Sequence, residues 1–188
     1  MIILASQSPR RKEILKEILQ DVPFTCIPST IDERSIQDNN CYQLCLKEAL
    51  AKGKDVASSH KDDIVIASDT MVLYHNKELG KPHTPEEALE MLRMLSGDKH
   101  TVITAYCIIK KEEVLVKRVV SANLFIEKMA DLEIEEYIET GSPFDKAGGY
   151  GVQDKDFINS QIIDGSIYTI MGLPKDELEQ DLIDLKII

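Results

Sequence analysis

The chain has 188 residues, of which 43% are hydrophobic, and its formal net charge is -11. This length and hydrophobic content allow one sizeable core, so we expect a single compact domain over residues 1–188. The negative charge argues against a protein that binds a nucleic-acid backbone through its general surface, because such binding needs a basic face.

Cysteine usage and hydropathy exclude further classes. The four cysteines form no CxxC pair and have no histidine at metal-ligand spacing, so we expect reduced thiols rather than a zinc site or a disulfide framework. No basic region followed by a long apolar stretch opens the chain, and no apolar run reaches the length of a membrane span. We therefore expect a cytoplasmic protein without a membrane partner.

Short β-branched apolar runs alternate with amphipathic stretches of helical period. The expected strands are 2–5, 64–67, 71–74, 102–109 and 119–126. The expected helices are 9–19, 40–57, 84–95, 131–139 and 175–185. This alternation predicts an α/β fold. The segment His75-Asn76-Lys77 resembles a hairpin turn, so the sheet should be at least partly antiparallel.

The first helix begins with cations where helix physics favours anions. Ser8 is a suitable N-cap and Pro9 a suitable first residue, but Arg10 and Arg11 occupy the first turn. Each misplaced charge costs roughly 0.3 to 1 kcal/mol unless an anion lies against it. The start of another helix, Thr84-Pro85-Glu86-Glu87, carries acids instead. The first helix start therefore indicates a phosphate site, and the alternative is two solvated surface arginines.

Acidic residues indicate a second part of the site. Asp69 lies in Ser68-Asp69-Thr70, between two buried strand runs, and unpaired burial of a carboxylate costs several kcal/mol. Asp69 is therefore the first catalytic candidate, unless a bulge or turn merely exposes it. Glu33 follows a strand-like segment and could join Asp69 as an oxygen ligand of a hard cation such as Mg²⁺. Alone, Glu33 is a loop acid.

Two lysines and a glycine-rich segment complete the candidate set. Lys52 has Glu48 four residues before it, which is ordinarily a solvated helix pair. Lys81 lies between a flexible glycine and a rigid proline, which either fixes its ammonium group or makes a plain surface turn. Segment 145–153 has three glycines in four residues before Gln153, whose amide can both donate to and accept from a base. The spacing fits neither a Rossmann fingerprint nor a Walker A loop, yet the ensemble suggests a nucleotide site.

Taken in chain order, these motifs resemble the signature series of the Maf family of nucleotide pyrophosphatases. The matching segments are Ser6-Gln7-Ser8-Pro9-Arg10-Arg11, Ser68-Asp69-Thr70, Gly80-Lys81-Pro82, Leu95-Ser96-Gly97, His100-Thr101-Val102-Ile103-Thr104-Ala105, 145–153, Gly165-Ser166-Ile167-Tyr168 and Met171-Gly172-Leu173-Pro174. They cover nearly the whole chain in the family's order. The resemblance implies a mixed twisted sheet flanked by helices, with two lobes around a nucleotide cleft, as in inosine triphosphatases. It also implies hydrolysis of a nucleoside triphosphate to the monophosphate and pyrophosphate in a cytoplasmic house-cleaning role.

Within that family, the branch acting on dTTP and UTP is marked by residues that match Arg10, Thr70 and Gln153. The sister branch acting on 7-methyl-GTP carries a tryptophan beside its Ser-Pro, and this chain has no tryptophan. The chain departs from the family pattern at two positions. Gly149 stands where many members have alanine, and Ile167 separates Ser166 from Tyr168 where the family pattern has Ser-Tyr or Asp-Tyr directly. The resemblance therefore implies action on dTTP and UTP, with CTP and modified pyrimidine nucleotides as further substrates.

The resemblance also implies a role for each candidate residue. Asp69 is the general base, and a divalent cation, Mg²⁺ first with Mn²⁺ and Co²⁺ as alternatives, is held by Asp69 and Glu33. Thr70 and Gln153 read the pyrimidine edge. Binding of the phosphates falls to Arg10 or Arg11, Lys52, Lys81 and the N–H groups behind Ser8.

Two other functions stay open at this stage. One is a pyrophosphatase of the same fold that acts on 7-methyl-GTP or another modified purine nucleotide. The other is a nucleotide-binding regulator of cell division that does not turn its ligand over. A homodimer would be usual for the family, and no nucleic-acid partner is expected.

Overall fold

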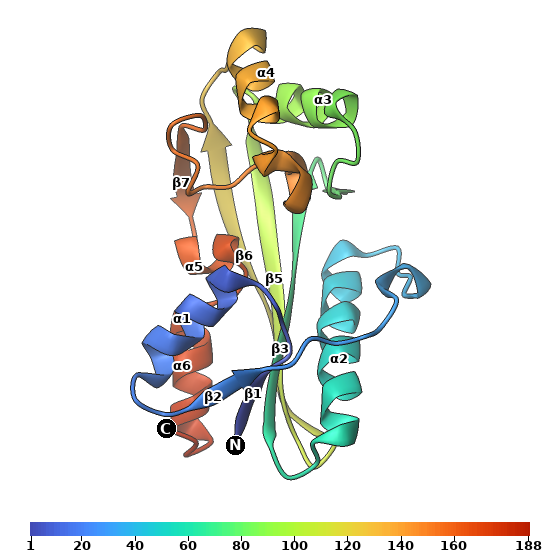
Figure 1. Ribbon diagram of the computed structural model, residues 1–188, viewed down its shortest axis with the longest axis vertical. Coiled ribbons are helices and arrows are strands. Elements are labelled where there is room, and N and C mark those ends of the chain that lie inside the picture. Colours follow the sequence, from blue (N-terminus) through green and yellow to red (C-terminus); the bar gives the residue numbers. More distant parts are fainter. The chain divides into compact units, whose positions relative to one another are not determined.

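The computed structural model describes residues 1–188, and its contacts divide the chain into two compact units (Figure 1). Unit 1 comprises Met1–Thr70, Thr104–Val120 and Tyr168–Ile188, and unit 2 comprises Met71–Ile103 and Ser121–Ile167. Each unit is assembled from separate stretches of chain, so no change of composition marks a boundary. The expectation of one domain over residues 1–188 stays a prediction.

The strands form one mixed sheet in the order β2-β1-β3-β5-β6-β7, with β4 paired to β3. Strand β1 (Ile2–Leu4) is parallel to both β2 (Phe24–Cys26) and β3 (Ile64–Tyr74), whereas β4 (Lys77–Leu79) is antiparallel to β3. Strands β5 (Lys99–Lys110) and β6 (Glu113–Ile126) precede β7 (Ser160–Asp164), which is antiparallel to β6. The predicted α/β fold with a mixed sheet flanked by helices is confirmed.

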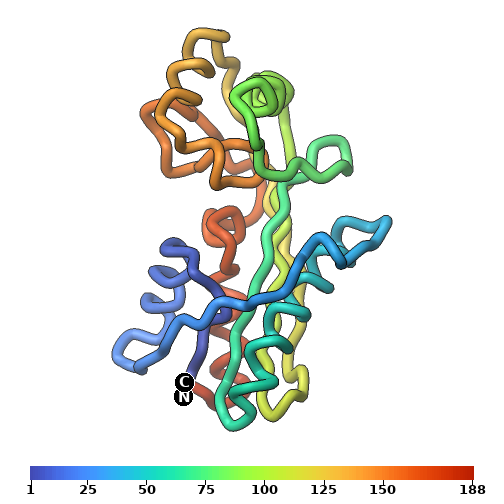
Figure 2. The backbone as a smooth tube through the Cα atoms, turned by 45° about the vertical axis from the view of Figure 1, so that its right-hand side comes forward, coloured from blue at the N-terminus to red at the C-terminus, as the bar shows by residue number.

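In unit 1 the sheet buries both faces under helices (Figures 1 and 2). Helices α1 (Pro9–Leu19) and α6 (Lys175–Asp184) pack on alternate strand residues such as Leu4 and Ile66. Helix α2 (Cys41–Ser59) packs on the intervening residues, such as Ile3 and Val65. Successive side chains of a strand point to opposite faces, so nearly continuous apolar runs are required in a sheet covered on both sides.

Helix α2 approaches the sheet closely at Gly53. A Cβ atom at this position would lie 2.8 Å from Cys107 Sγ in β5, a distance that real Cβ atoms do not show. The close approach fixes which face of α2 points inward. None of the helices is long and apolar enough to cross a membrane.

Strand β3 runs without interruption through Ser68-Asp69-Thr70, so the expected break between strands 64–67 and 71–74 is wrong. Ser68 is fully buried, and its hydroxyl donates to the carbonyl of Gly172, 3.0 Å away. The polar side chains are therefore satisfied by partners far along the chain rather than by solvent at a break.

Unit 2 contains the hairpin that the sequence predicts. His75 and Asn76 have φ angles of 48° and 62°, the left-handed values that a two-residue hairpin turn between β3 and β4 requires. Helices α3 (Pro85–Leu95) and α4 (Asp131–Glu139) pack against each other, and the 3-10 turns η2 (Ser142–Asp145) and η3 (Ala147–Gly149) follow.

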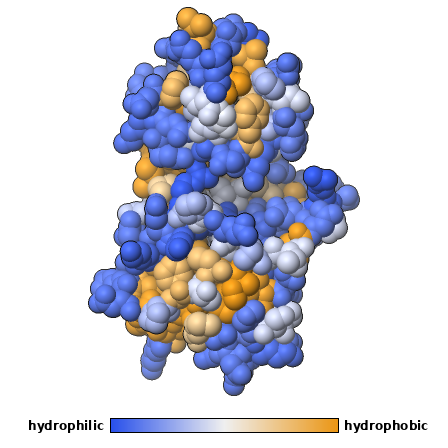
Figure 3. All heavy atoms as spheres, in the orientation of Figure 1, coloured by the Kyte–Doolittle hydropathy of each residue, from blue (hydrophilic) through white to orange (hydrophobic).

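Three short elements are absent from the sequence-based expectations: β2, β7 and helix α5 (Ile167–Met171). Strand β2 has three half-buried residues at one edge of the sheet, and Figure 3 shows apolar atoms gathered over this region. Strand β7 is the other edge, where four of five residues are exposed. Such short, half-exposed strands lack the long apolar run by which a buried strand is recognised.

Candidate active site

A lysine and two carboxylates meet in unit 1, where α2 faces β3. Lys52 of α2 donates to Asp69 Oδ1 in β3 across 2.5 Å and lies 3.0 Å from Glu33 Oε1. Glu33 begins the 3-10 turn η1 (Glu33–Ser35), which Asp32 caps by accepting from the N–H of Arg34. Burial lowers the pKa of Lys52, but the two carboxylates more than offset this effect, so the pKa is raised. The ammonium group is charged at neutral pH.

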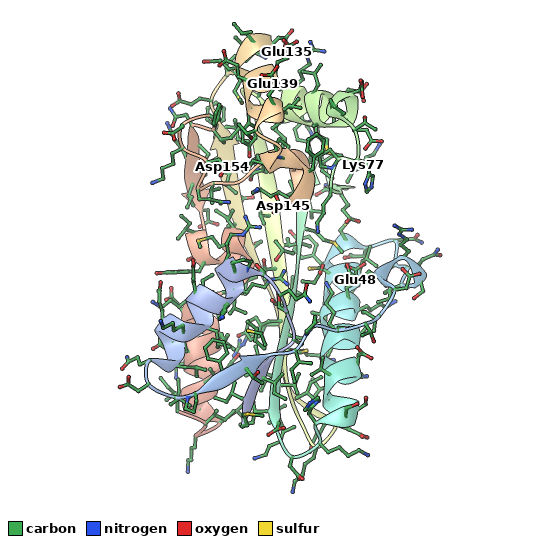
Figure 4. All side chains as sticks on the ribbon, in the orientation of Figure 1. Glu48, Lys77, Glu135, Glu139, Asp145 and Asp154 are labelled. Atoms are coloured by element: carbon green, nitrogen blue, oxygen red, sulfur yellow. The ribbon has the colours of Figure 1, made fainter.

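Glu48 is a third acid of this cluster that the sequence analysis did not select. It lies one turn before Lys52 on the face of α2 that turns toward β3 (Figure 4), and it is 9% exposed. Burial, followed by the charge of Asp69 and a hydrogen bond with it, raises the pKa of Glu48 to about 8. The solvated Glu48–Lys52 pair considered from the sequence is therefore wrong. The four-residue spacing identified the shared face but not its burial.

The acidic cluster of Glu33, Glu48 and Asp69 has the composition of a cation site. One oxygen ligand atom from each carboxylate lies within 4.8 Å of the others. Hard divalent cations such as Mg²⁺ take carboxylate oxygens. Burial first, and then the charge of Asp69, raises the pKa of Glu48. Three carboxylates gathered this closely fit a divalent cation.

Arg11 joins the first turn of α1 to the strand that carries Asp69. Its Nη1 donates to the carbonyl of Ser68 (2.9 Å) and its Nη2 to Thr70 Oγ1 (3.0 Å). Ser8 caps the helix, although its hydroxyl accepts from the N–H of Arg11 at a long 3.5 Å. Arg10 is half-buried beside them. Arg11 is therefore bonded to β3 on both sides of Asp69, and both arginines are half-buried.

A chain of hydroxyl groups holds Arg11. Thr104 of β5 donates its only hydroxyl hydrogen to the carbonyl of Thr169 (2.7 Å), so Thr70 must donate to Thr104 across their 2.9 Å contact. Thr70 then accepts from Arg11 and keeps one lone pair. Gly172, with φ of +98°, makes room: a Cβ there would lie 2.9 Å from Arg11 Nε. Thr104 and Gly172 belong to the family-like motifs but were not selected as site residues.

Two of the selected residues belong to unit 2. Lys81 is exposed, and the preceding carbonyl, that of Gly80, accepts from the N–H of Gly148 at 3.0 Å. This bond joins the Gly80-Lys81 turn to the glycine-rich segment that carries Gln153. Gln153 is exposed, and its amide folds over Gly151 so closely that a Cβ there would lie 2.5 Å from Nε2. Unit 1 therefore contains Ser8, Arg10, Arg11, Glu33, Lys52, Asp69 and Thr70, and unit 2 contains Lys81 and Gln153. The roles of all these residues stay predictions.

Comparisons relate this chain to known proteins. The model of the Maf-like protein family matches residues 1–185. A dTTP/UTP pyrophosphatase of Clostridium botulinum is 40% identical over 189 residues, which cover 98% of this chain and 96% of the relative. A dTTP/UTP pyrophosphatase of Bacillus cereus is 41% identical over 181 residues, covering 96% and 93%. The solved structure of a HAM1 protein from Coxiella burnetii matches with a TM-score of 0.51 and 16% identity over 97% of this chain and 98% of that one, which is a likeness of fold.

Proposed function

Since this chain belongs to the Maf-like protein family, we propose that it hydrolyses pyrimidine nucleoside triphosphates, dTTP and UTP above all, to the monophosphate and pyrophosphate. The near-full-length relatives bear that activity in their names. The observation in the structure that carries the proposal is the contact of Lys52 with Asp69 inside the acidic cluster. Burial of ionised groups costs free energy, and buried charged side chains that perturb each other's pKa values are typical of catalytic sites. A buried lysine–aspartate contact among further acids therefore favours a catalytic role over a purely structural one.

Asp69 is the proposed general base. The attacking water loses a proton to Asp69 while its oxygen forms a bond to the α-phosphorus, and the bond from that phosphorus to the bridging oxygen breaks to release pyrophosphate. Lys52 donates to Asp69 Oδ1 and so fixes in place the carboxylate that would accept the proton.

Glu33, Glu48 and Asp69 are the residues that would hold a divalent cation, with Mg²⁺ first and Mn²⁺ or Co²⁺ as alternatives. When bound, the cation neutralises phosphate charge and favours attack at phosphorus. Arg10 and the N–H groups behind Ser8 would bind phosphate oxygens at the start of α1, where the helix dipole favours an anion.

The remaining roles concern the phosphate charge and the pyrimidine base. Lys81 would supply a further cation for the phosphates. Gln153 would read the pyrimidine edge, together with Thr70, whose hydroxyl keeps one lone pair after its bonds to Arg11 and Thr104. A cytoplasmic location and a homodimer stay predictions.

The test is a substrate panel with the purified full chain and Mg²⁺. Pyrophosphate and the monophosphate are measured from dTTP, UTP and CTP and from two modified purine nucleotides, 7-methyl-GTP and ITP. We expect kcat/KM to be highest for dTTP and UTP. Faster hydrolysis of a modified purine would contradict the pyrimidine assignment, and tight binding without turnover of any nucleotide would contradict the enzymatic one.

A further inference from the structure

The tyrosine hydroxyl of Tyr137 holds the turn that carries Gln153. Tyr137 lies in α4 and is fully buried. Its hydroxyl donates to Asp154 Oδ2 across 2.6 Å and accepts from the N–H of Gly151 at 3.2 Å. The N–H of Asp154 in turn donates to the carbonyl of Gly151 (3.0 Å). One phenol therefore joins the residues on both sides of the Gly151–Asp154 turn.

The carboxylate of Asp154 is fixed from a second side. Ser142 Oγ donates to Asp154 Oδ2 across 2.8 Å, and the buried Lys146 donates to both the carbonyl and the hydroxyl of Ser142, at 2.7 and 2.9 Å. Lys146 Nζ lies 4.0 Å from Asp154 Oδ2 and compensates its charge. Figure 4 shows Asp154 and Asp145 in this part of unit 2. A satisfied network of this kind rigidifies the backbone to which it is bonded.

The hydroxyl of Tyr137 is a dependable donor. Burial, together with the neighbouring Asp154 carboxylate, raises the pKa of Tyr137, so the phenol keeps its proton across the working range of pH. The ring itself packs against Phe157, with ring centroids 5.4 Å apart. Loss of the hydroxyl alone would therefore remove the two hydrogen bonds and leave the ring packing in place.

A glutamine can select between uracil and cytosine only if its amide is held. Uracil and thymine present a carbonyl and an N–H where cytosine presents an amino group and a bare ring nitrogen. A half-turn of the amide exchanges its donor and acceptor, so a freely rotating amide serves both bases. In this chain the amide of Gln153 lies against the backbone of Gly151, so a change in the shape of the turn would move the amide.

We infer that Tyr137 and Asp154 are positioning residues that hold Gln153 in the orientation for uracil and thymine, and so set the preference for dTTP and UTP over CTP. The inference rests on the proposed function and goes beyond it, because neither residue is among those proposed to bind the nucleotide. Preorganised recognition groups discriminate better than mobile ones, because a fixed group cannot move to form hydrogen bonds with the wrong base.

The test compares two tyrosine variants of the full chain. Tyr137→Phe removes the hydroxyl that donates to Asp154. Tyr106→Phe is the matched control, because Tyr106 is also fully buried and its hydroxyl donates to a carboxylate, that of Asp181 in unit 1, across 2.5 Å. For each variant kcat and KM are measured with UTP and with CTP, and folding is checked by thermal unfolding.

We expect Tyr137→Phe to reduce the ratio of kcat/KM for UTP to that for CTP about tenfold, the size of one lost hydrogen bond. The change should lie in KM, with kcat for UTP within about twofold of wild type, because the general base Asp69 and the acidic cluster are unchanged. Tyr106→Phe should keep the wild-type ratio. A purely structural role of Tyr137 would lower both substrates' parameters equally and would overturn the inference.

A second pair of variants keeps the test decisive if Tyr137→Phe folds poorly. Asp154→Asn retains an oxygen that accepts from Tyr137, whereas Asp154→Ala does not, so the asparagine variant should keep most of the UTP preference and the alanine variant should lose it. Equal preference in the two variants would overturn the inference. Absence of pyrimidine turnover in the wild-type chain would instead overturn the proposed function, and the inference with it.

Discussion

Replacing Glu48 by glutamine should make the metal-free protein more stable and its cation site weaker. The substitution keeps the size of the side chain and removes its charge. The pKa of Glu48 is raised from 4.5 to about 8, mainly by burial and then by Asp69. Above pH 4.5 the unfolded chain gives up this proton while the native protein retains it, so the native state loses stability as pH rises and the loss is complete above pH 8.

The magnitude follows from the size of the shift. A displacement from 4.5 to about 8 corresponds to roughly 5 kcal/mol at about 1.36 kcal/mol per pKa unit. The carboxyl group keeps some exposure and is hydrogen-bonded to Asp69, so we expect about 2 kcal/mol of this to be recovered in Glu48→Gln at pH 8. At pH 4.5 the native carboxyl is protonated and the unfolded one is about half protonated, so the stabilities of the variant and the wild type should differ through this group by only about 0.4 kcal/mol.

The assay is urea unfolding at pH 4.5 and pH 8 in a chelator, repeated at pH 8 with Mg²⁺. Glu135→Gln serves as the control, because Glu135 is an exposed acid on α4 outside the acidic cluster (Figure 4). Mg²⁺ should stabilise the wild type and Glu135→Gln by mass action and Glu48→Gln much less. A Glu48→Gln protein that is destabilised at pH 8, or that gains as much from Mg²⁺ as the wild type, would refute the assignment of Glu48 to a cation site.

Two further substitutions test the packing of the site and of unit 2. Gly172→Ala places a Cβ 2.9 Å from Arg11 Nε at a φ of +98°, so it should cost about 1 to 3 kcal/mol of stability and lower kcat/KM at least tenfold; wild-type kinetics with UTP would show that Arg11 needs no such room. Burial lowers the pKa of His100 to about 4, so protonation of the unfolded chain below pH 6.5 should remove roughly 2 kcal/mol of stability between pH 7 and pH 5. His100→Gln, which can still reach Tyr150, should lose about 2 kcal/mol less over that interval in urea unfolding, and an unchanged pH slope would contradict this origin.

The regular elements follow from local signals in the sequence. Ser8 and Thr84 are N-caps followed by proline, and both helices begin where those signals place them, at Pro9 and Pro85. The hairpin at His75-Asn76 follows from residues that tolerate left-handed backbone. Such features depend on neighbours within a few residues, so one sequence suffices to predict them.

The interior of the site could not be predicted in the same way. Ser68-Asp69-Thr70 was expected to interrupt a strand, because its partners Arg11, Lys52 and Gly172 are distant in sequence. When such partners cannot be seen, three polar residues within an apolar run indicate a segment exposed to solvent, because burial of unpaired polar groups is costly. Glu48 could not be identified for the same reason. A four-residue spacing shows that Glu48 and Lys52 share a helix face, but it does not show whether that face is buried against the sheet.

The most direct test of the central claim is hydrolysis of UTP in water enriched in oxygen-18, with the wild-type chain and with Asp69→Asn. Attack on the α-phosphorus places one labelled oxygen in UMP and none in the released pyrophosphate. We expect this pattern for the wild type, together with loss of turnover and retention of nucleotide binding in Asp69→Asn. Label in pyrophosphate, products of UDP and phosphate, or wild-type turnover by Asp69→Asn would contradict the account.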